Sequence, residues 1–173
     1  MENVIFIPAT ENQREREAML SRAINSLQVL SEEYSITLIG MGDYPGFRSI
    51  NTEYFHRLKL HYLTANYVDY NNDMVSSFIG KYRKNFYAEP DQYSFRGYDV
   101  AMYFIDAYGK MGNNFVECIE DFNPRLLQSN FNFQRIDNLS GFMNHTLYIM
   151  NYTPDFRVQK ITTVTEGRLL VEN

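Results

Sequence analysis

Short polar segments follow two apolar runs of the chain, and they hold residue types that could bind a small charged molecule. The runs Val4–Ile7 and Ile36–Ile39 are continuously apolar, which is typical of buried parallel strands. Open α/β sheets bind ligands beyond the carboxyl ends of such strands. The candidate ligand-binding residues at these two ends are Thr10, Glu11, Asn12, Gly42, Asp43 and Tyr44. The sequence therefore predicts a binding site made from two strand-end loops.

The segment around Thr10 has two interpretations. Thr10 and Gln13 fit a capping box, in which Thr10 is the N-cap of a helix and Gln13 is the third helical residue. Free backbone N–H groups at such a helix start would also accept a carboxylate or a phosphate from a ligand. The plainer interpretation is that Thr10 only caps its helix, and both stay open at this point.

Signatures of enzymes are missing from the sequence. Gly40 and Gly42 begin a dinucleotide-binding pattern, but Pro45 stands where that fingerprint needs its third glycine. There is no Walker A sequence, no Ser-centred nucleophile elbow and no Cys-x-x-Cys pair. His56 and His61 are five residues apart, which does not suit a helical metal pair, and the paired carboxylates lie in polar runs typical of solvated faces. We therefore expect a protein that is not an enzyme, with no catalytic residue, no metal and no cofactor.

Composition indicates a globular protein with one substantial core. The chain has 173 residues, of which 45% are hydrophobic and 21% charged. A formal charge of −5 argues against nucleic acid as a partner, and no apolar run approaches the roughly 20 residues that span a bilayer. Residues 1–3 carry no basic segment, so we expect no signal peptide here. Cys118 has no cysteine partner, and we expect it to be a small buried apolar side chain.

The hydrophobic pattern predicts an α/β fold with a parallel sheet flanked by helices and a β-hairpin near the C-terminus. A strand, a helix and a second strand follow one another at the spacing of a right-handed βαβ unit. The turn of the hairpin is predicted at Thr153-Pro154-Asp155, and a further helix of about a dozen residues is expected after Gly112. The predicted strands are 4–7, 36–40 and 60–64, the helices 11–32, 73–87 and 95–111, and the hairpin 146–163, followed by a flexible tail at 166–173.

Two consecutive amphipathic helices are predicted between Asp73 and Gly112. Asp73 stands where an N-cap is expected, and Pro90 ends the first helix. Four-residue spacing places one set of side chains on a common face of that helix: Met74, Phe78, Tyr82 and Phe86. The second helix is expected to turn another set inward: Tyr98, Ala101, Met102, Ile105 and Gly109.

These helices also carry a family resemblance. A helix, then Glu89-Pro90-Asp91, then Gly97-Tyr98-Asp99-Val100-Ala101 opening an apolar helix, resembles the type I periplasmic binding proteins. More narrowly, it is similar to the branched-chain amino-acid (Leu/Ile/Val) receptors of ABC transporters. The residues at matching positions are Phe86, Glu89, Pro90, Asp91, Tyr98, Asp99 and Ala101. The C-terminal hairpin resembles the end of these receptors as well, and a weaker likeness extends from about Val4 to Thr163.

The resemblance gives the strand-end loops specific roles. In that family they supply a side chain that covers the ligand and an acidic group for its ammonium. Asp43 lies within one residue of the position of that acid, and Tyr44 beside it could stack on a ligand. Thr10 departs from the family pattern, which often has an aromatic residue there. The segment 66–72, beginning with Asn66 and Tyr67, matches a hinge strand between two lobes, and a plain loop with aromatic anchors is the alternative.

Receptors of this family have two lobes and are about twice as long as this chain. Residues 1–165 resemble the C-terminal portion, with a crossover near 65–72, so a ligand would be shared with an N-terminal lobe. We therefore expect a non-catalytic solute-binding module for an amino acid or small polar ligand, in the periplasm or cell envelope, with an ABC permease as partner. The alternative is an envelope interaction or scaffold module that kept the fold and lost solute binding. Helix faces that such a lobe would cover also predict a homodimer.

Overall fold

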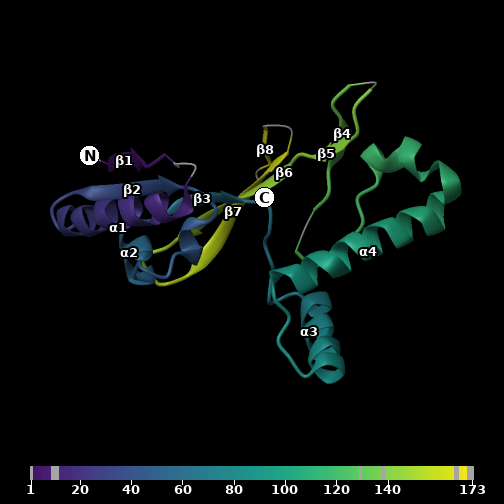
Figure 1. Ribbon diagram of the computed structural model, residues 1–173, viewed down its shortest axis with the longest axis horizontal. Helices are drawn as coiled ribbons and strands as arrows, with labels where there is room; N and C mark the ends of the chain where they lie inside the picture. Colours follow the sequence, from purple (N-terminus) through teal and green to yellow (C-terminus); the bar gives the residue numbers. More distant parts are fainter. Residues whose placement is uncertain (1, 9–11, 129, 138, 166–167, 171–173) are drawn as a thin grey trace. The chain divides into compact units, whose positions relative to one another are not determined.

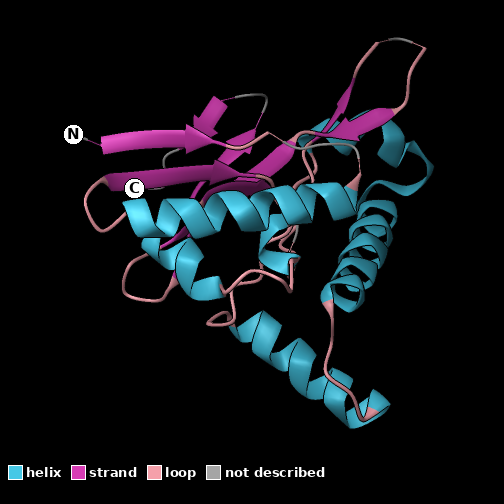
Figure 2. Cartoon of the chain, turned by 60° about the vertical axis from the view of Figure 1, so that its left-hand side comes forward, coloured by secondary structure: helices cyan, strands magenta, loops and turns pink. Residues whose placement is uncertain are grey.

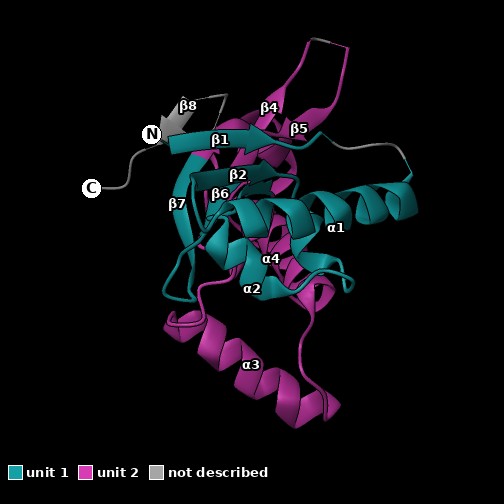
Figure 3. Ribbon diagram, turned by 90° about the vertical axis from the view of Figure 1, so that its left-hand side faces the viewer, with its two compact units in different colours: residues 1–64, 148–163, 171–173 teal, residues 65–147, 164–170 magenta. Residues whose placement is uncertain are grey.

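The chain forms two compact units. The computed structural model describes residues 2–8, 12–128, 130–137, 139–165 and 168–170. Unit 1 comprises residues 1–64, 148–163 and 171–173, and unit 2 comprises residues 65–147 and 164–170 (Figure 3). The predictions for Thr10, for Glu11 and for most of the tail fall outside the described residues.

Unit 1 is built around a mixed β-sheet (Figure 1). Within unit 1 the strand order is β1-β2-β3-β6-β7; β1 and β2, then β2 and β3, pair in parallel, while β3 and β6 are antiparallel. The predicted parallel start of the sheet and the later hairpin are thus confirmed. The elements are β1 (Glu2–Phe6), α1 (Gln13–Leu30), β2 (Ser35–Gly40), the 3₁₀ helix η1 (Tyr44–Gly46), α2 (Thr52–Arg57), β3 (His61–Thr64), β6 (Thr146–Tyr152) and β7 (Val158–Thr165).

One face of this sheet carries the core of unit 1. Ile36 and Leu38 of β2 belong to one buried cluster with Leu20 and Ile24 of α1. Helix α1 runs along the strands of this sheet (Figure 2). Residues on the opposite face are far more open, because alternate residues of a strand point to opposite faces. Val4 is 62% exposed. The first strand is therefore not buried on both faces, which corrects the sequence-based prediction.

Helix boundaries follow local capping. Helix α1 begins at Gln13, where the side chain of Asn12 accepts hydrogen bonds from the N–H groups of Arg14 and Glu15 (3.0 and 3.5 Å). Asn12 is thus the N-cap, two residues beyond the predicted one. The short helix α2 was not predicted from the sequence, and Asn51 caps it in the same way.

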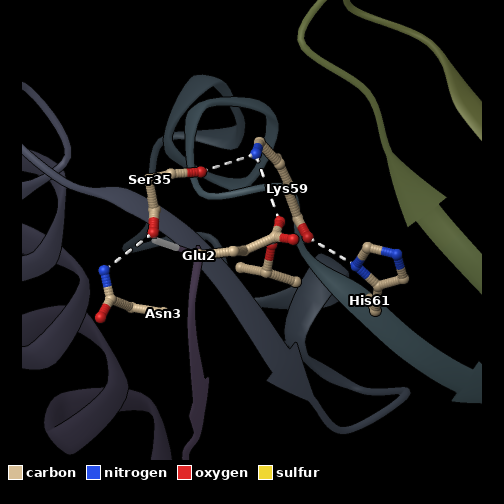
Figure 4. A network of polar contacts seen from close by, with 6 residues as sticks. Glu2, Asn3, Ser35, Lys59 and His61 are labelled. Atoms are coloured by element: carbon tan, nitrogen blue, oxygen red, sulfur yellow. Dashed lines mark hydrogen bonds and ion pairs between the residues drawn. The ribbon is translucent and has the colours of Figure 1, made fainter.

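A network of polar side chains lies at the amino-terminal ends of β1 and β2 (Figure 4). The Lys59 ammonium donates to Ser35 Oγ at 3.1 Å and lies 3.5 Å from the Glu2 carboxylate. The Thr37 hydroxyl donates to Glu2 as well, and this bond, followed by the charge of Lys59, lowers the pKa of Glu2. These contacts lie at the end of β1 and β2 opposite to the predicted binding loops.

Unit 2 is mainly helical. Its elements are α3 (Asp73–Phe86), α4 (Gln92–Met111), the 3₁₀ helix η2 (Gly112–Asp121), β4 (Phe133–Arg135), β5 (Phe142–Asn144) and β8 (Arg168–Leu170). Both predicted helices are present, and the segment after Gly112 is helical but of the 3₁₀ type. Strands β4 and β5 form an antiparallel pair. Strand β8 occupies part of the region predicted as a tail.

The predicted inward faces of α3 and α4 are found only in part, since Phe78 and Tyr98 pack against the buried cluster of this unit. Val75 and Phe95 are buried, while Phe86 at 65% and Ile105 at 65% are exposed. Met102 is also largely open. The Phe78 ring lies 5.1 Å from that of Phe95, centroid to centroid. Helix α4 is apolar on nearly all sides, so spacing alone does not indicate which face is inward.

Caps again determine where these two helices start and stop. Asn72, and not Asp73, is the N-cap of α3, since its side chain accepts from the N–H of Met74 at 2.8 Å. The helix ends at Tyr87 in the left-handed conformation (φ 53°), three residues before Pro90. Asp91 and Ser94 then form a capping box at the start of α4.

Aromatic rings enclose Tyr103 in a second cluster. The rings of Phe104, Phe122, Phe131 and Phe133 each lie 5.2–5.3 Å from that of Tyr103, centroid to centroid. Its hydroxyl lies 3.2 Å from the carbonyl oxygens of Ile119 and Phe122. Burial raises the pKa of Tyr103 to about 12. Cys118, on η2, is exposed, which corrects the expectation of a buried cysteine.

Candidate functional site

In unit 1, the start of helix α1 contacts the loop that follows β2. Arg16, near the start of α1, forms an ion pair with Asp43, which follows β2. The side chain of Arg16 is 17% exposed and that of Asp43 is 35% exposed. Contacts of this kind are stronger at such partly buried positions than at a fully solvated surface. The pair links the helix after the first strand to the loop after the second.

Asp43 uses its two carboxylate oxygens unequally. Oδ2 accepts from the Arg16 guanidinium. Oδ1 is buried, yet no hydrogen-bond donor among the described residues reaches it. A buried carboxylate oxygen normally has a partner, because leaving it without one costs free energy. Asp43 therefore lies at the end of a parallel strand with one oxygen paired with Arg16 and one that no donor in the described part of the chain reaches.

Gly42 is fixed by packing against β3. A Cβ atom at this position would lie 2.4 Å from the carbonyl oxygen of Leu63, which no side chain tolerates. A Cβ atom at Gly40 would lie 2.4 Å from the ring of Tyr44. The two glycines thus allow the backbone to pack directly against the Tyr44 ring and the Leu63 carbonyl group. This packing fixes the position of the neighbouring Asp43 at the strand end.

Tyr44 is a core residue. Its side chain is fully buried, and its hydroxyl donates to the carbonyl oxygen of Ile7 at 2.8 Å. Burial, and then the negative charge of Asp43, raise the pKa of Tyr44. A ring without exposed surface has none with which to stack on a ligand, so the predicted stacking role is corrected. Tyr44 instead ties the loop after β2 to the end of the first strand.

The predicted hinge residues lie at the start of unit 2, directly after the chain leaves unit 1. The Asn66 side-chain oxygen accepts from Arg96 at 3.1 Å and from Gln128 at 3.4 Å. The N–H of Tyr67 donates to the carbonyl oxygen of Gln128 at 3.1 Å. Movement at this segment stays a prediction, and the contacts show that its first two residues are held to α4 and to residue 128.

The structural role of the Asp99 carboxylate was not predicted from the sequence. Its carboxylate is fully buried in α4 and accepts the backbone N–H groups of Leu127 (2.7 Å) and Gln128 (2.9 Å). Buried charges are rare unless they are paired or hydrogen-bonded. The available signal was the four-residue spacing from Phe95 through Asp99 to Tyr103, which places the acid among buried aromatics.

The side chains of His56 and His61 have structural contacts. His56 Nδ1 lies 2.8 Å from the carbonyl oxygen of Thr153, and His61 Nδ1 lies 2.7 Å from that of Lys59. Within the described part of the chain, no group of three or more His, Cys, Asp or Glu residues is placed to hold a metal ion. None of the described helices is both long and apolar enough to cross a membrane.

No protein-family model matches the chain, and no curated protein matches it either. The groups of unit 1 that could bind a ligand are those of the Arg16–Asp43 contact. An acid and a guanidinium in contact at a strand end present one negative and one positive group. A zwitterionic molecule can satisfy both, with its ammonium on Asp43 and its carboxylate on Arg16.

Proposed function

We propose that the chain is a non-catalytic solute-binding module of the type I periplasmic-binding-protein kind, which binds an amino acid or a small polar ligand. The observation that supports this most is Oδ1 of Asp43, which no donor of the described residues reaches and which lies within one residue of where the resemblance implies an acid for the ligand's ammonium. The mixed α/β sheet with loops at its parallel strand ends is also compatible with that fold. On this proposal the protein works in the periplasm or cell envelope with an ABC permease.

Specificity on this proposal comes from the Arg16–Asp43 pair and not from an aromatic platform, because Tyr44 is buried. The ligand would exchange the internal ion pair for two intermolecular ones. Such an exchange gains little net free energy when only one wall of a cleft is present, since desolvation offsets the new contacts. We therefore expect isolated residues 1–173 to bind an amino acid weakly, with a dissociation constant of about 1 mM or higher.

The test is a titration of the ¹⁵N-labelled chain with leucine, followed by amide chemical shifts. We expect shifts at residues 41–44 and 12–16 that saturate in the millimolar range. Asp43→Asn should abolish them, since the amide keeps the shape but loses the charge. Glu53→Gln, a change at an exposed acid of α2, should leave them unchanged. Equal titration by wild type and Asp43→Asn would contradict the proposal.

The second candidate is an envelope interaction or scaffold module that kept the fold and lost solute binding. The Arg16–Asp43 ion pair favours it, because an acid that is already neutralised attracts an external ammonium less strongly. The same titration separates the two candidates. An absence of shifts near Asp43 at saturating leucine, alanine and glutamate would favour the scaffold.

A further inference from the structure

Strand β1 is the outermost strand of the sheet in unit 1 (Figure 3). All five of its residues pair with β2 in one continuous parallel register, and no other described strand pairs with it. Natural edge strands are commonly protected from further pairing by a bulge, a proline or a charged side chain. Residues 3–6 of β1 have none of these, and both Val4 and Phe6 are exposed. The edge of β1 is therefore open to a further strand.

The backbone groups of Val4 and Phe6 face away from β2. The Ile7 N–H donates to the carbonyl oxygen of Ile39 at 3.4 Å, so residue 7 turns its backbone groups toward β2. Because these directions alternate along a strand, residue 5 shares the direction of residue 7, and Val4 and Phe6 have the opposite one. In the described part of the chain, no hydrogen bond reaches the outer side of either residue. Two N–H donors and two carbonyl acceptors are thus available to an extended backbone.

A largely apolar groove of about 460 Å³ lies between β1 and the last turns of α1. It is lined by Ile5 of β1 and by three side chains at or just beyond the end of α1: Leu27, Leu30 and Tyr34. Leu30 and Tyr34 are about half exposed. A strand added about 4.8 Å from β1 would direct every second side chain toward α1 and over this groove. The groove therefore suits aliphatic side chains at alternate positions of such a strand.

Polar contacts hold the first residues of β1 in place (Figure 4). The Asn3 side chain donates to the carbonyl oxygen of Ser35 at 3.1 Å, and the Glu2 carboxylate accepts from the Thr37 hydroxyl at 2.8 Å. Lys59 adds a cationic partner to Glu2. A strand that is already ordered loses little conformational entropy when another strand pairs with it. The edge is thus organised for pairing in the free protein.

An extended peptide is the occupant that fits both the edge and the groove. A small molecule can fill an apolar groove, but an extended backbone also presents donors and acceptors at the repeat of a strand edge. The stretches of the 173 residues that the structure does not describe are at most three residues long. They are shorter than β1, so none of them can supply a strand that pairs along its whole length.

We propose that unit 1 binds an extended aliphatic segment of a partner protein, which adds as a strand to the outer edge of β1 and places every second side chain in the groove beside α1. Main-chain hydrogen bonds to Val4 and Phe6 provide affinity, and the groove provides selectivity. The proposal is independent of solute binding, because neither Arg16 nor Asp43 lines the groove.

A titration of the ¹⁵N-labelled 173-residue chain with the peptide acetyl-Lys-Val-Thr-Val-Thr-Val-Lys-amide tests the proposal. We expect saturable shifts at residues 3–7 and 27–34, with a dissociation constant of about 0.1–1 mM. Hydrogen exchange at the N–H groups of Val4 and Phe6 should slow, because these groups become bonded. A peptide with serine in place of each valine should bind about tenfold more weakly. Equal binding of the two peptides, or shifts that avoid β1, would overturn the proposal.

Val4→Pro separates pairing at the edge from the fold of unit 1. Proline removes the outward N–H and none of the bonds to β2, and edge strands tolerate proline at such positions. Peptide binding should weaken about tenfold, since a main-chain hydrogen bond is lost. Val4→Thr keeps the N–H and should bind as wild type does, and exchange at the Ile5 N–H should be alike in the two variants. Equal peptide binding by both variants would contradict the proposal.

Leu30→Glu tests the groove. Glutamate at this half-exposed position places a charge where an aliphatic side chain would lie, and peptide binding should weaken about tenfold. Val29→Glu is the matched control, because Val29 is 56% exposed and lies outside the described lining of the groove. An equal effect of both variants would contradict the proposal.

Sedimentation velocity of the free chain addresses a second copy as the occupant. We expect the same sedimentation for wild type and Val4→Pro from low to high micromolar concentration. A dimer that Val4→Pro abolishes would assign the edge of β1 to a second copy and overturn the peptide as its partner.

Discussion

The core of unit 1 consists largely of aliphatic side chains on one face of a sheet, whereas unit 2 buries both aromatic rings and a carboxylate. In unit 1, Leu20, Ile24 and Leu38 have no exposed surface. In unit 2, the fully buried side chains include Asp99, and Gln128 is only 3% exposed. Burial of apolar area is not directional, while hydrogen bonds to a carboxylate are. The two units should therefore respond differently to the same kinds of substitution.

The largest effect is expected from Leu38→Ala in the core of unit 1. It removes a fully buried side chain and leaves a cavity, which should lower the free energy of unfolding by about 3–4 kcal/mol. Ile39→Ala is the control, because Ile39 points to the open face and is 39% exposed. Urea denaturation followed by circular dichroism measures both. Equal losses would mean that the two faces of the sheet are buried alike.

Asp99→Asn should destabilise unit 2 by about 2 kcal/mol, since the buried N–H groups of Leu127 and Gln128 lose a charged acceptor. Hydrogen exchange at residues 127 and 128 should accelerate, while exchange in β2 should not change. Asp106→Asn is the matched control on the same helix. Its surface pair with Lys110 is worth about 0.3–0.5 kcal/mol. Unchanged exchange at 127–128 would refute the anchoring role.

High pH should weaken both units. Burial, and then the neighbouring Tyr152, raise the pKa of Tyr62 in unit 1 to about 12, and burial raises that of Tyr103 in unit 2 to about 12. A tyrosine with a raised folded-state pKa stabilises the fold below its unfolded pKa of about 10, and this is lost as pH rises toward 12. Ultraviolet titration of tyrosinate should show late ionisation in wild type. Tyr62→Phe and Tyr103→Phe should each remove one late-titrating group, and an unchanged titration would contradict this.

The smallest expected effect is a gain in stability, from a substitution at the end of α3. Tyr87 caps α3 in the left-handed conformation and is 93% exposed. Tyr87→Gly should raise the free energy of unfolding by about 0.5–1 kcal/mol, because glycine adopts this conformation without strain. Ala88→Gly, one residue later, is the control and should give no gain. Thermal denaturation compares them, and a loss of stability in Tyr87→Gly would show that the ring contributes a contact.

Much of unit 1 was predictable from the sequence because its strands and its long helix follow simple periodicities. The strands 4–7, 36–40 and 60–64 are each found within one or two residues. Helix α2 was missed because six residues are too few for a periodic signal. The mixed character of the sheet arises from the pairing of β3 with β6, which are more than 80 residues apart in the sequence.

The candidate site was predictable in position but not in detail. Periodicity and topology place Asp43 and Gly42 at a strand end, yet nothing local indicates that Tyr44 turns inward to bond Ile7. Likewise, the ion pair with Arg16 depends on how α1 packs on the sheet. In unit 2, the inward face of α4 could not be chosen because both of its faces are apolar. Long-range packing decides each of these points.

Packing in the loop after β2 also constrains how the protein can evolve. Every second residue of this segment is constrained. The ring of Tyr44 leaves no room for a side chain at residue 40, and the carbonyl oxygen of Leu63 leaves none at residue 42. Tyr44 itself is held by the hydrogen bond of its buried hydroxyl. Of the alternate positions, Met41 is 39% exposed, whereas Asp43 is held by its ion pair with Arg16. Relatives that share this loop should therefore diversify at residue 41 alone, and at residue 43 only together with residue 16. A coupled pair of positions on an invariant support would let natural selection change what the loop contacts while the support still folds.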